Sequence, residues 1–204
     1  MCHALLGDAR FYEQLLRFDE DLAARARASG CPCGGQLHSA RFPRKPRGGP
    51  VDLTGYDYRL SFCCDREGCR MRVTPPSLRF IGRRVYLGAV VVLVSAMMRG
   101  LTSWRVAALC KLVGADRRTL ERWRRWWREV FPFTALWRDA RARFMPPVTE
   151  AELPASLLEG FDGERRLQLV GVLKLLLPLT TSSWSSMVVL DPQRMLAAGR
   201  DRGK

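Results

Sequence analysis

The residues of this chain that could do chemistry are its cysteines, seven in 204 residues. Five of them stand in two short stretches, "CPCGGQLH" (31–38) and "SFCCDREGCR" (61–70). An odd number of cysteines argues against a pure disulfide framework. The first residues have the pattern of an amphipathic helix rather than a cleavable signal, so we expect a cytoplasmic protein whose thiols stay reduced. Close groups of cysteines in a reduced protein indicate a metal site.

The downstream stretch holds more cysteines than a zinc knuckle needs, and strand alternation selects among them. "YDYRLSFCC" (56–64) has the pattern of a strand, whose side chains point alternately to opposite faces. The alternation predicts an apolar inner face (Tyr58, Leu60, Phe62 and Cys64) and a polar outer face (Arg59, Ser61 and Cys63). Cys64 and Cys69 bracket four residues, a usual ligand spacing, and Gly68 eases the turn. Cys63 is therefore the spare cysteine.

The upstream stretch is less regular, because one residue separates Cys31 from Cys33 where two to four are usual. The "GG" that follows favours a knuckle, since backbone amides can turn there towards the thiolates. His38 is an alternative to one of these two ligands, because four residues also separate it from Cys33. The favoured zinc ligands are Cys31, Cys33, Cys64 and Cys69. Four protein ligands leave no open position, so this zinc would be structural rather than catalytic.

The charge of the chain indicates its partner. The formal net charge is +14 at pH 7, from 34 Lys and Arg against 20 Asp and Glu. Such a field attracts polyanions, nucleic acid first and an acidic membrane surface second. The longest apolar run, 85–98, is too short to span a bilayer. Arginine dominates over lysine, and its planar fork suits phosphates and guanine edges, so we expect double-stranded DNA as the partner.

One arginine-rich stretch, "RFPRKPRGG" (41–49), lies between the two cysteine groups. Prolines hold such a segment extended while Arg44, Lys45 and Arg47 project from it. Two interpretations are open at this point. The segment is either an arm whose arginines enter a minor groove, or a solvated basic loop that touches only phosphate.

A second arginine-rich stretch belongs to a pair of predicted helices within 100–131. Thr102 is a candidate N-cap, and Gly114 can take the left-handed conformation that ends the first helix. Asp116 then caps the second helix. An apolar stripe on the first helix faces the core: Val106, Leu109, Cys110 and Val113.

The second helix of this pair has two opposite faces when its residues are placed 100° apart. Its core face is apolar: Leu120, Trp123, Trp127 and Val130. Its outer face is charged: Arg118, Glu121, Arg122 and Arg125. A glycine turn followed by an arginine-rich helix predicts a helix-turn-helix, with an apolar helix at 83–98 packed behind the pair. The predicted DNA contacts on this helix are Arg117, Arg118, Arg122 and Arg125. An ordinary helical hairpin with a charged surface is the alternative.

These patterns divide the chain into four segments. They are an N-terminal helix (1–28), a zinc ribbon with its basic arm (29–80), a helix-turn-helix domain (81–145), and a C-terminal helix and tail (146–204). The C-terminal helix, "ERRLQLVGVLKLLL", is stopped by Pro178. The predicted fold is therefore mainly α with a small β zinc ribbon. It comprises a three-helix, homeodomain-like helix-turn-helix domain and a C-terminal helix.

The motifs carry a resemblance to a family. "CPCGG" followed by "FCCDREGCR" resembles the zinc ribbon of bacterial insertion-element transposases, and "LTSWRVAALCKLVGADRRTLERWRRW" is similar to their homeodomain-like helix-turn-helix. In its order of motifs, over roughly 29–145, the chain resembles a family of short bacterial proteins associated with mobile elements. The resemblance implies DNA recognition within transposition or recombination.

The chain lacks an evident catalytic site of its own. A recombinase of the ribonuclease-H type needs acidic residues at strand ends that hold two metal ions, and only "MVVLD", ending at Asp191, has that form. Two histidines, His3 and His38, are too few for a histidine-based nuclease. We therefore predict a sequence-specific DNA-binding protein that is accessory to transposition and is not itself an enzyme.

A separate transposase or integrase subunit would then supply the chemistry. Two alternatives remain open. A transcription regulator with the same modules would form a homodimer, with an interface in 149–178. A non-autonomous subunit of a recombinase or nuclease would need a partner chain to complete its active site.

Overall fold

The computed structural model of the chain describes residues 2–44, 46, 48–49, 55–81, 86–98, 100 and 102–181. The α-helices in these residues are α1 (Cys2–Leu6), α2 (Ala9–Ala28), α3 (Gly88–Met97), α4 (Ser103–Val113), α5 (Arg117–Arg125), α6 (Ala135–Ala140), α7 (Ala155–Glu159) and α8 (Arg165–Leu175). The strands are β1 (Leu37–Ser39), β2 (Phe42–Pro43), β3 (Tyr58–Arg59), β4 (Phe62–Cys64) and β5 (Arg72–Val73). The prediction of a mainly helical chain with a small β part is confirmed.

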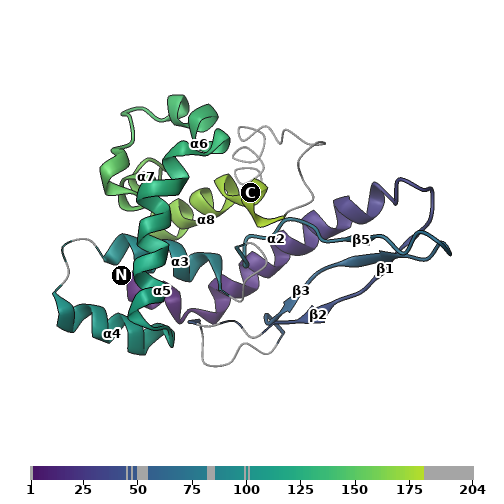
Figure 1. The fold of residues 1–204 in the computed structure, drawn as a ribbon, viewed down its shortest axis with the longest axis horizontal. Coiled ribbons are helices and arrows are strands. Elements are labelled where there is room, and N and C mark those ends of the chain that lie inside the picture. Colours follow the sequence, from purple (N-terminus) through teal and green to yellow (C-terminus); the bar gives the residue numbers. More distant parts are fainter. Residues whose placement is uncertain are drawn as a thin grey trace, which may run out of the picture.

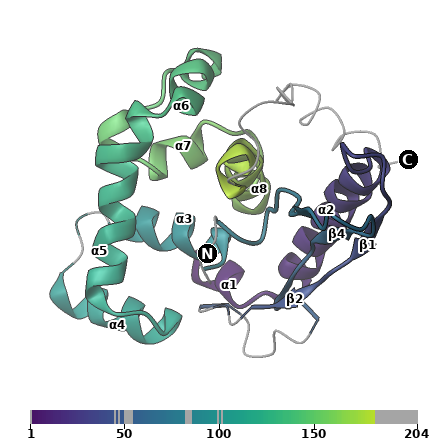
Figure 2. The same ribbon diagram turned by 45° about the vertical axis from the view of Figure 1, so that its right-hand side comes forward.

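The molecule has a helical part and a strand part. Helices α3 to α8 gather in one region, and the strands lie beside the long helix α2 (Figures 1 and 2). The strands form two antiparallel sheets, one with the order β1-β4-β5 and one that pairs β2 with β3. The two parts have separate hydrophobic clusters among the described residues, and α2 contributes side chains to both.

The single helix predicted over 1–28 is two helices in the structure. Gly7 and Asp8 separate α1 from α2, and the Asp8 carboxylate accepts hydrogen bonds from the backbone N–H groups of Arg10 (3.0 Å) and Phe11 (3.3 Å). These bonds satisfy N–H groups that have no partner within the helix, so α2 begins there. One stripe of α2 is buried at four-residue spacing: Phe11, Leu15, Asp19 and Ala23.

Helices α3 and α8 form the centre of the helical part, between the α4–α5 pair and α2 (Figures 1 and 2). Every residue of α3 from Gly88 to Ser95 is buried, as expected for a helix that is apolar on all sides. Gly88 permits the close approach of α8, because a Cβ there would lie 2.9 Å from Cδ2 of Leu173. Among the described residues, no helix combines the length and apolarity needed to cross a membrane.

The packing of α8 bears on the homodimer interface expected in 149–178. Leu167 of α8 is 54% exposed, whereas its other apolar side chains are buried within the chain: Leu169, Val170, Val172, Leu173 and Leu175. These buried side chains pack within the chain, and the homodimer interface in 149–178 stays a prediction. The helix is followed by a 3-10 turn, Leu177–Thr180, that contains the predicted stop, Pro178. Asp191 lies outside the described residues.

The prediction of one continuous strand over 56–64 was wrong. It is broken between β3 and β4, which belong to different sheets: β3 pairs with β2, and β4 pairs with β1 and β5. The strict alternation of faces is lost at the break. Arg59 and Ser61, predicted on the polar outer face, are 2% and 1% exposed. Ser61 donates a hydrogen bond to the carbonyl oxygen of Ala40, and Arg59 enters the boundary between the two parts of the molecule.

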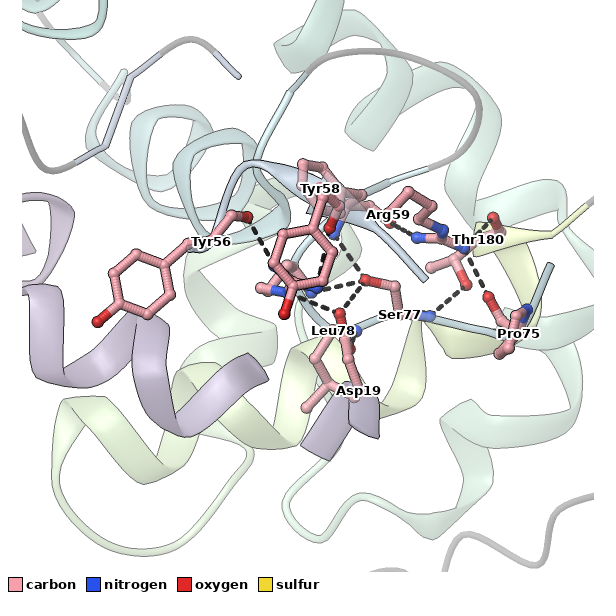
Figure 3. Close-up of polar contacts among 10 residues, drawn as sticks. Asp19, Tyr56, Tyr58, Arg59, Pro75, Ser77, Leu78 and Thr180 are labelled. Atoms are coloured by element: carbon pink, nitrogen blue, oxygen red, sulfur yellow. Dashed lines mark hydrogen bonds and ion pairs between the residues drawn. The ribbon is translucent and has the colours of Figure 1, made fainter. Parts of the chain in front are cut away.

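A buried polar network joins the two parts (Figure 3). The Arg59 guanidinium donates to the carbonyl oxygens of Pro75 (2.8 Å), Thr180 (3.3 Å) and Phe80 (3.4 Å). Thr180 ends the segment after α8, so this one side chain links the strands to the C-terminal end of the helical core. Burial lowers the pKa of Arg59 to about 10, still well above neutrality, and the side chain stays charged.

Asp19 and Arg79 form the second half of this network, and both side chains are almost fully buried. Arg79 Nε lies 2.9 Å from Asp19 Oδ2, and the same carboxylate accepts hydrogen bonds from the Ser77 hydroxyl (2.5 Å) and the Leu78 backbone N–H (2.6 Å). Burial raises the pKa of Asp19, while Arg79 and these hydrogen bonds act in the opposite direction. Each buried charge thus has several partners, which is the condition for tolerating charge in a core.

Candidate metal centre and basic helix pair

Four cysteine thiols converge in the strand part. Cys31 and Cys33 come from the turn after α2, whereas Cys64 ends β4 and Cys69 lies in the next turn. All four sulfur atoms lie within 4.8 Å of one another. The Sγ–Sγ distances are 3.4 Å for Cys31–Cys33, 3.5 Å for Cys33–Cys64 and 3.7 Å for Cys31–Cys69. A tetrahedral zinc ion with bonds of about 2.3 Å holds its sulfur ligands about 3.8 Å apart, so the cluster has the right size for a metal.

Glycines allow the two turns to close around these sulfurs. Gly34 and Gly68 both have φ of +81°, in the left-handed region that other residues rarely adopt. Gly35 meets a different requirement, because a Cβ there would lie 2.5 Å from Cys64 Sγ. A side chain at that position would therefore push one candidate ligand out of the cluster.

The thiols differ in how readily they ionise. The backbone N–H of Gly35, 3.4 Å from the sulfur, is the main cause that lowers the pKa of Cys33 to about 6. Burial is the main cause that raises the pKa of Cys64 to about 12. Four thiolates at this separation repel one another, so a bound cation is what would stabilise them all in the ionised form.

The structure places His38 and Cys63 outside the cluster. They lie directly opposite each other on the paired strands β1 and β4. The His38 side chain is 60% exposed, and its Nε2 is 3.3 Å from Asp65 Oδ2. The four cysteines favoured from the sequence therefore converge without help from His38. In the part of the chain that the structure describes, they are the only group of three or more potential metal ligands that does so.

Helices α4 and α5 are joined by the predicted tight turn. Gly114 ends α4 in the left-handed conformation (φ 60°, ψ 32°). The Asp116 carboxylate accepts a hydrogen bond of 2.7 Å from the Thr119 backbone N–H, which starts α5. Thr102 occupies the N-cap position of α4, but its hydroxyl makes no capping hydrogen bond. The predicted end of α4 at Gly114 and the predicted cap of α5 at Asp116 are thus confirmed, whereas a capping hydrogen bond from Thr102 is not.

The outer face of α5 is basic and exposed. The four arginines of α5 that are predicted to contact DNA are all exposed: Arg117, Arg118, Arg122 and Arg125. Two of them have acidic neighbours one turn further along: Arg117 Nε is 2.7 Å from Glu121 Oε1, and Arg125 Nε is 3.9 Å from Glu129 Oε2. Arg122 donates to the Thr119 hydroxyl at 3.1 Å. The opposite face packs on α3.

One residue of the predicted core face lies elsewhere. Leu120, Trp123 and Trp127 are buried, but Val130 is 48% exposed. The prediction assumed an α-helix up to 131, whereas Trp126–Val130 form a π-helical turn. This turn is wound more widely than an α-helix, so the side chains that follow are rotated away from their α-helical positions.

The structure describes part of the predicted basic arm. The Arg44 guanidinium lies 4.6 Å from the centre of the Phe42 ring, and the Arg44 backbone N–H donates to the Asp57 carbonyl at 2.5 Å. Lys45 and Arg47 lie outside the described residues. Sequence reasoning missed the contact of Gly48 with Val113, the last residue of α4.

Sequence reasoning also missed the network of Asp19, Arg59 and Arg79. A signal for it exists in α2, where Asp19 interrupts an apolar stripe at four-residue spacing. A carboxylate on a buried stripe requires a buried partner, because an unpaired charge in a core is too costly. The identity of that partner, 60 residues away, has no local signal.

Comparison of the chain with protein-family models, with curated proteins and with solved structures gives no match. A functional conclusion must therefore come from the geometry of the cysteine cluster and of the α4–α5 pair.

Proposed function

We propose that this chain is a DNA-binding protein in which α4 and α5 act as a helix-turn-helix. The observation that carries the proposal is the outer face of α5, with four exposed arginines that begin directly after a capped N-terminus. In this motif the N-terminal part of the second helix enters the major groove. The buried opposite face of α5, packed on α3, supports the proposal, because a reading helix needs a rigid base.

The cysteine cluster is proposed to hold a structural zinc ion in a zinc ribbon. Four sulfur ligands suit zinc or iron, and zinc is the ion that we propose, because four cysteines from two tight turns are typical of structural zinc sites. Cys31, Cys33, Cys64 and Cys69 would bind the ion, which would supply folding free energy to the strand part and no catalysis. The two modules together support a role accessory to transposition or recombination, with the chemistry in a separate transposase or integrase subunit.

The proposal is tested by measuring the affinity for a fluorescent DNA duplex, obtained by in-vitro selection, at a series of salt concentrations. Arginine–phosphate contacts release counterions, so log K should fall linearly with log salt, by about 0.9 per contact. Replacing Arg118, Arg122 and Arg125 by alanine together should flatten this line. Arg138→Ala, an exposed arginine on α6, is the control and should leave it unchanged. Absence of salt-dependent binding to any selected duplex would refute the proposal.

A further inference from the structure

A small pocket lies where α3 and α5 pack against each other (Figures 1 and 2). Its volume is about 300 Å³, and its lining is Ile81, Tyr86, Val91, Arg122, Trp123 and Trp126. This volume is at the lower end of the range for ligand pockets, so the pocket suits a molecule of one or two rings. Neither the cysteine cluster nor the buried polar network contributes to it.

The walls of the pocket are aromatic and are held in place by other rings. Tyr86 meets Trp123 edge to face, with the ring centres 4.9 Å apart. Trp126 packs on Trp127 and Phe131, which are both fully buried, at 4.9 Å and 5.5 Å between ring centres. Rings packed in this way have few alternative positions, so the pocket is formed before a ligand arrives. A π-helical turn also begins at Trp126, and such turns are frequent at functional sites.

Arg122 is the one charged residue among the described residues that line the pocket. It is exposed, whereas the rest of the lining is buried or half-buried, so Arg122 lies at the mouth. It donates to the Thr119 hydroxyl at 3.1 Å and forms no ion pair with a described residue, unlike Arg117 and Arg125. A guanidinium has five N–H donors, so most of those of Arg122 remain for a ligand.

This combination of walls and mouth selects a ligand chemistry. An aromatic interior accepts a flat ring, and a single cation at the mouth accepts one negative group. A carboxylate fits, because it takes two parallel hydrogen bonds from a guanidinium while it stays at the solvated end of the pocket. A nucleobase fits less well, since the hydrogen-bonding groups along its edge would face apolar side chains.

We propose that this pocket binds a small aromatic carboxylate, and that the bound acid competes with DNA for Arg122. The site stands on the geometry alone, whereas the competition rests on the proposed function, in which Arg122 is one of the DNA contacts. A carboxylate paired with Arg122 neutralises the charge that DNA would meet. The acid and DNA then lower each other's affinity by the same factor, and the protein releases DNA in response to the acid.

The site is tested with 2-naphthoate, a carboxylate on two fused rings, titrated into the full chain by isothermal titration calorimetry. One equivalent should bind, and Arg122→Gln should weaken binding by about tenfold or more, because a charge-assisted pair is lost. Arg118→Gln is the matched control, since this exposed arginine of α5 does not line the pocket, and it should keep the parent's affinity for the acid. Absence of binding by the parent, or equal affinity of the parent and Arg122→Gln, overturns the site.

A second pair of variants locates the ring of the acid. Trp126→Phe removes part of one wall and should weaken binding of 2-naphthoate several-fold. Trp104→Phe alters a tryptophan of α4 that is 76% exposed and outside the pocket, and should have no effect. Loss of binding in Trp104→Phe alone would mean that the acid adheres to exposed apolar surface. Adenosine monophosphate should bind more weakly than 2-naphthoate, and equal or tighter binding would assign the pocket to a nucleotide instead.

The competition is tested by measuring the Kd of the parent for the selected duplex with and without saturating 2-naphthoate. The acid should raise this Kd by about 5–150-fold, the usual range of coupling between two sites. Sodium acetate at the same concentration controls for ionic strength and should leave the Kd nearly unchanged. An unchanged Kd in the presence of 2-naphthoate overturns the competition. A parent that binds 2-naphthoate but no duplex refutes the proposed function and leaves the pocket assigned, so the two failures are distinguishable.

Discussion

At the scale of single residues, the cysteine cluster depends on which face of a short strand each thiol occupies. Cys63 and Cys64 are adjacent in sequence, yet their surroundings differ. Cys64 is 1% exposed and lies with the other candidate ligands, whereas Cys63 is partly exposed and lies opposite His38. The side chains of neighbouring residues in a strand point to opposite faces, so only one of the two can reach the cluster. This gives a matched pair of substitutions one residue apart.

Cys64→Ser should release the metal, because a serine hydroxyl is a poor zinc ligand and three thiolates cannot close the site. Residues 29–80 should unfold with it, since a structural metal supplies folding free energy directly. Cys63→Ser should keep about one zinc per chain, as in the parent. Metal content by mass spectrometry and the far-UV circular dichroism spectrum measure both effects. Equal metal loss in the two variants would contradict the assigned ligands.

At the scale of an element, the proposed DNA contacts of α5 differ along the length of the helix. Arg118 is the second residue of α5, Arg122 lies one turn further along the outer face, and Arg125 ends the helix. The N-terminal portion of such a helix is the part that reaches base edges, so Arg118 and Arg122 are better placed for this than Arg125. An ion pair with Glu129 at 3.9 Å holds Arg125 only loosely, so it remains able to meet phosphate.

Arg118→Ala or Arg122→Ala should therefore cost about 1–3 kcal/mol on the selected duplex, because a bidentate contact to guanine is lost, and much less on a scrambled duplex. Arg125→Ala should weaken both duplexes alike. The affinity of each variant for the selected duplex and for the scrambled duplex is measured at one fixed salt concentration. If all three substitutions lower both affinities equally, α5 contacts only the DNA backbone.

At the scale of the whole molecule, α2 and the buried polar network make the strand part and the helical part interdependent. Residues of α2 up to Leu22 pack on the helical cluster and Ala23 and Ala26 pack on the strand cluster, so Asp19 lies one turn before the change from one to the other. Its partners reach both parts through Arg79, which also holds the Tyr56 and Tyr58 carbonyls. The network thus sets how the proposed ribbon sits on the proposed helix-turn-helix.

Asp19→Asn should lower the free energy of unfolding by about 3–5 kcal/mol, because it leaves the Arg79 charge buried without its counterion. Glu13→Gln is the matched control on the same helix, where an exposed carboxylate pairs with Arg17 at 2.6 Å. That substitution should cost about 0.3–0.5 kcal/mol, the value of an exposed pair one turn apart. Urea denaturation of both variants measures the difference. Similar losses in the two would mean that the buried pair does not hold the parts together.

The sequence by itself determined the features that a few neighbouring residues specify. Cysteine spacing and glycine turns selected the four thiols that converge, and Gly114 and Asp116 marked the end of α4 and the start of α5. Such signals are reliable because caps and left-handed turns are set by local backbone geometry. The helical periodicity of polar and apolar residues also placed the arginines of α5 in solvent.

Only the tertiary structure decided the features that depend on distant contacts. Arg59 is buried because a carbonyl 121 residues away accepts its hydrogen bond, and no local pattern contains that partner. Val130 is exposed because the π-helical turn Trp126–Val130 rotates its side chain away from the α-helical position. The buried apolar side of α8 packs against α3 and α7 of this chain. Position 48 requires glycine because Val113, the last residue of α4, packs against it. Each outcome follows from packing between segments far apart in the chain, where burial and hydrogen-bond satisfaction override the local periodicity.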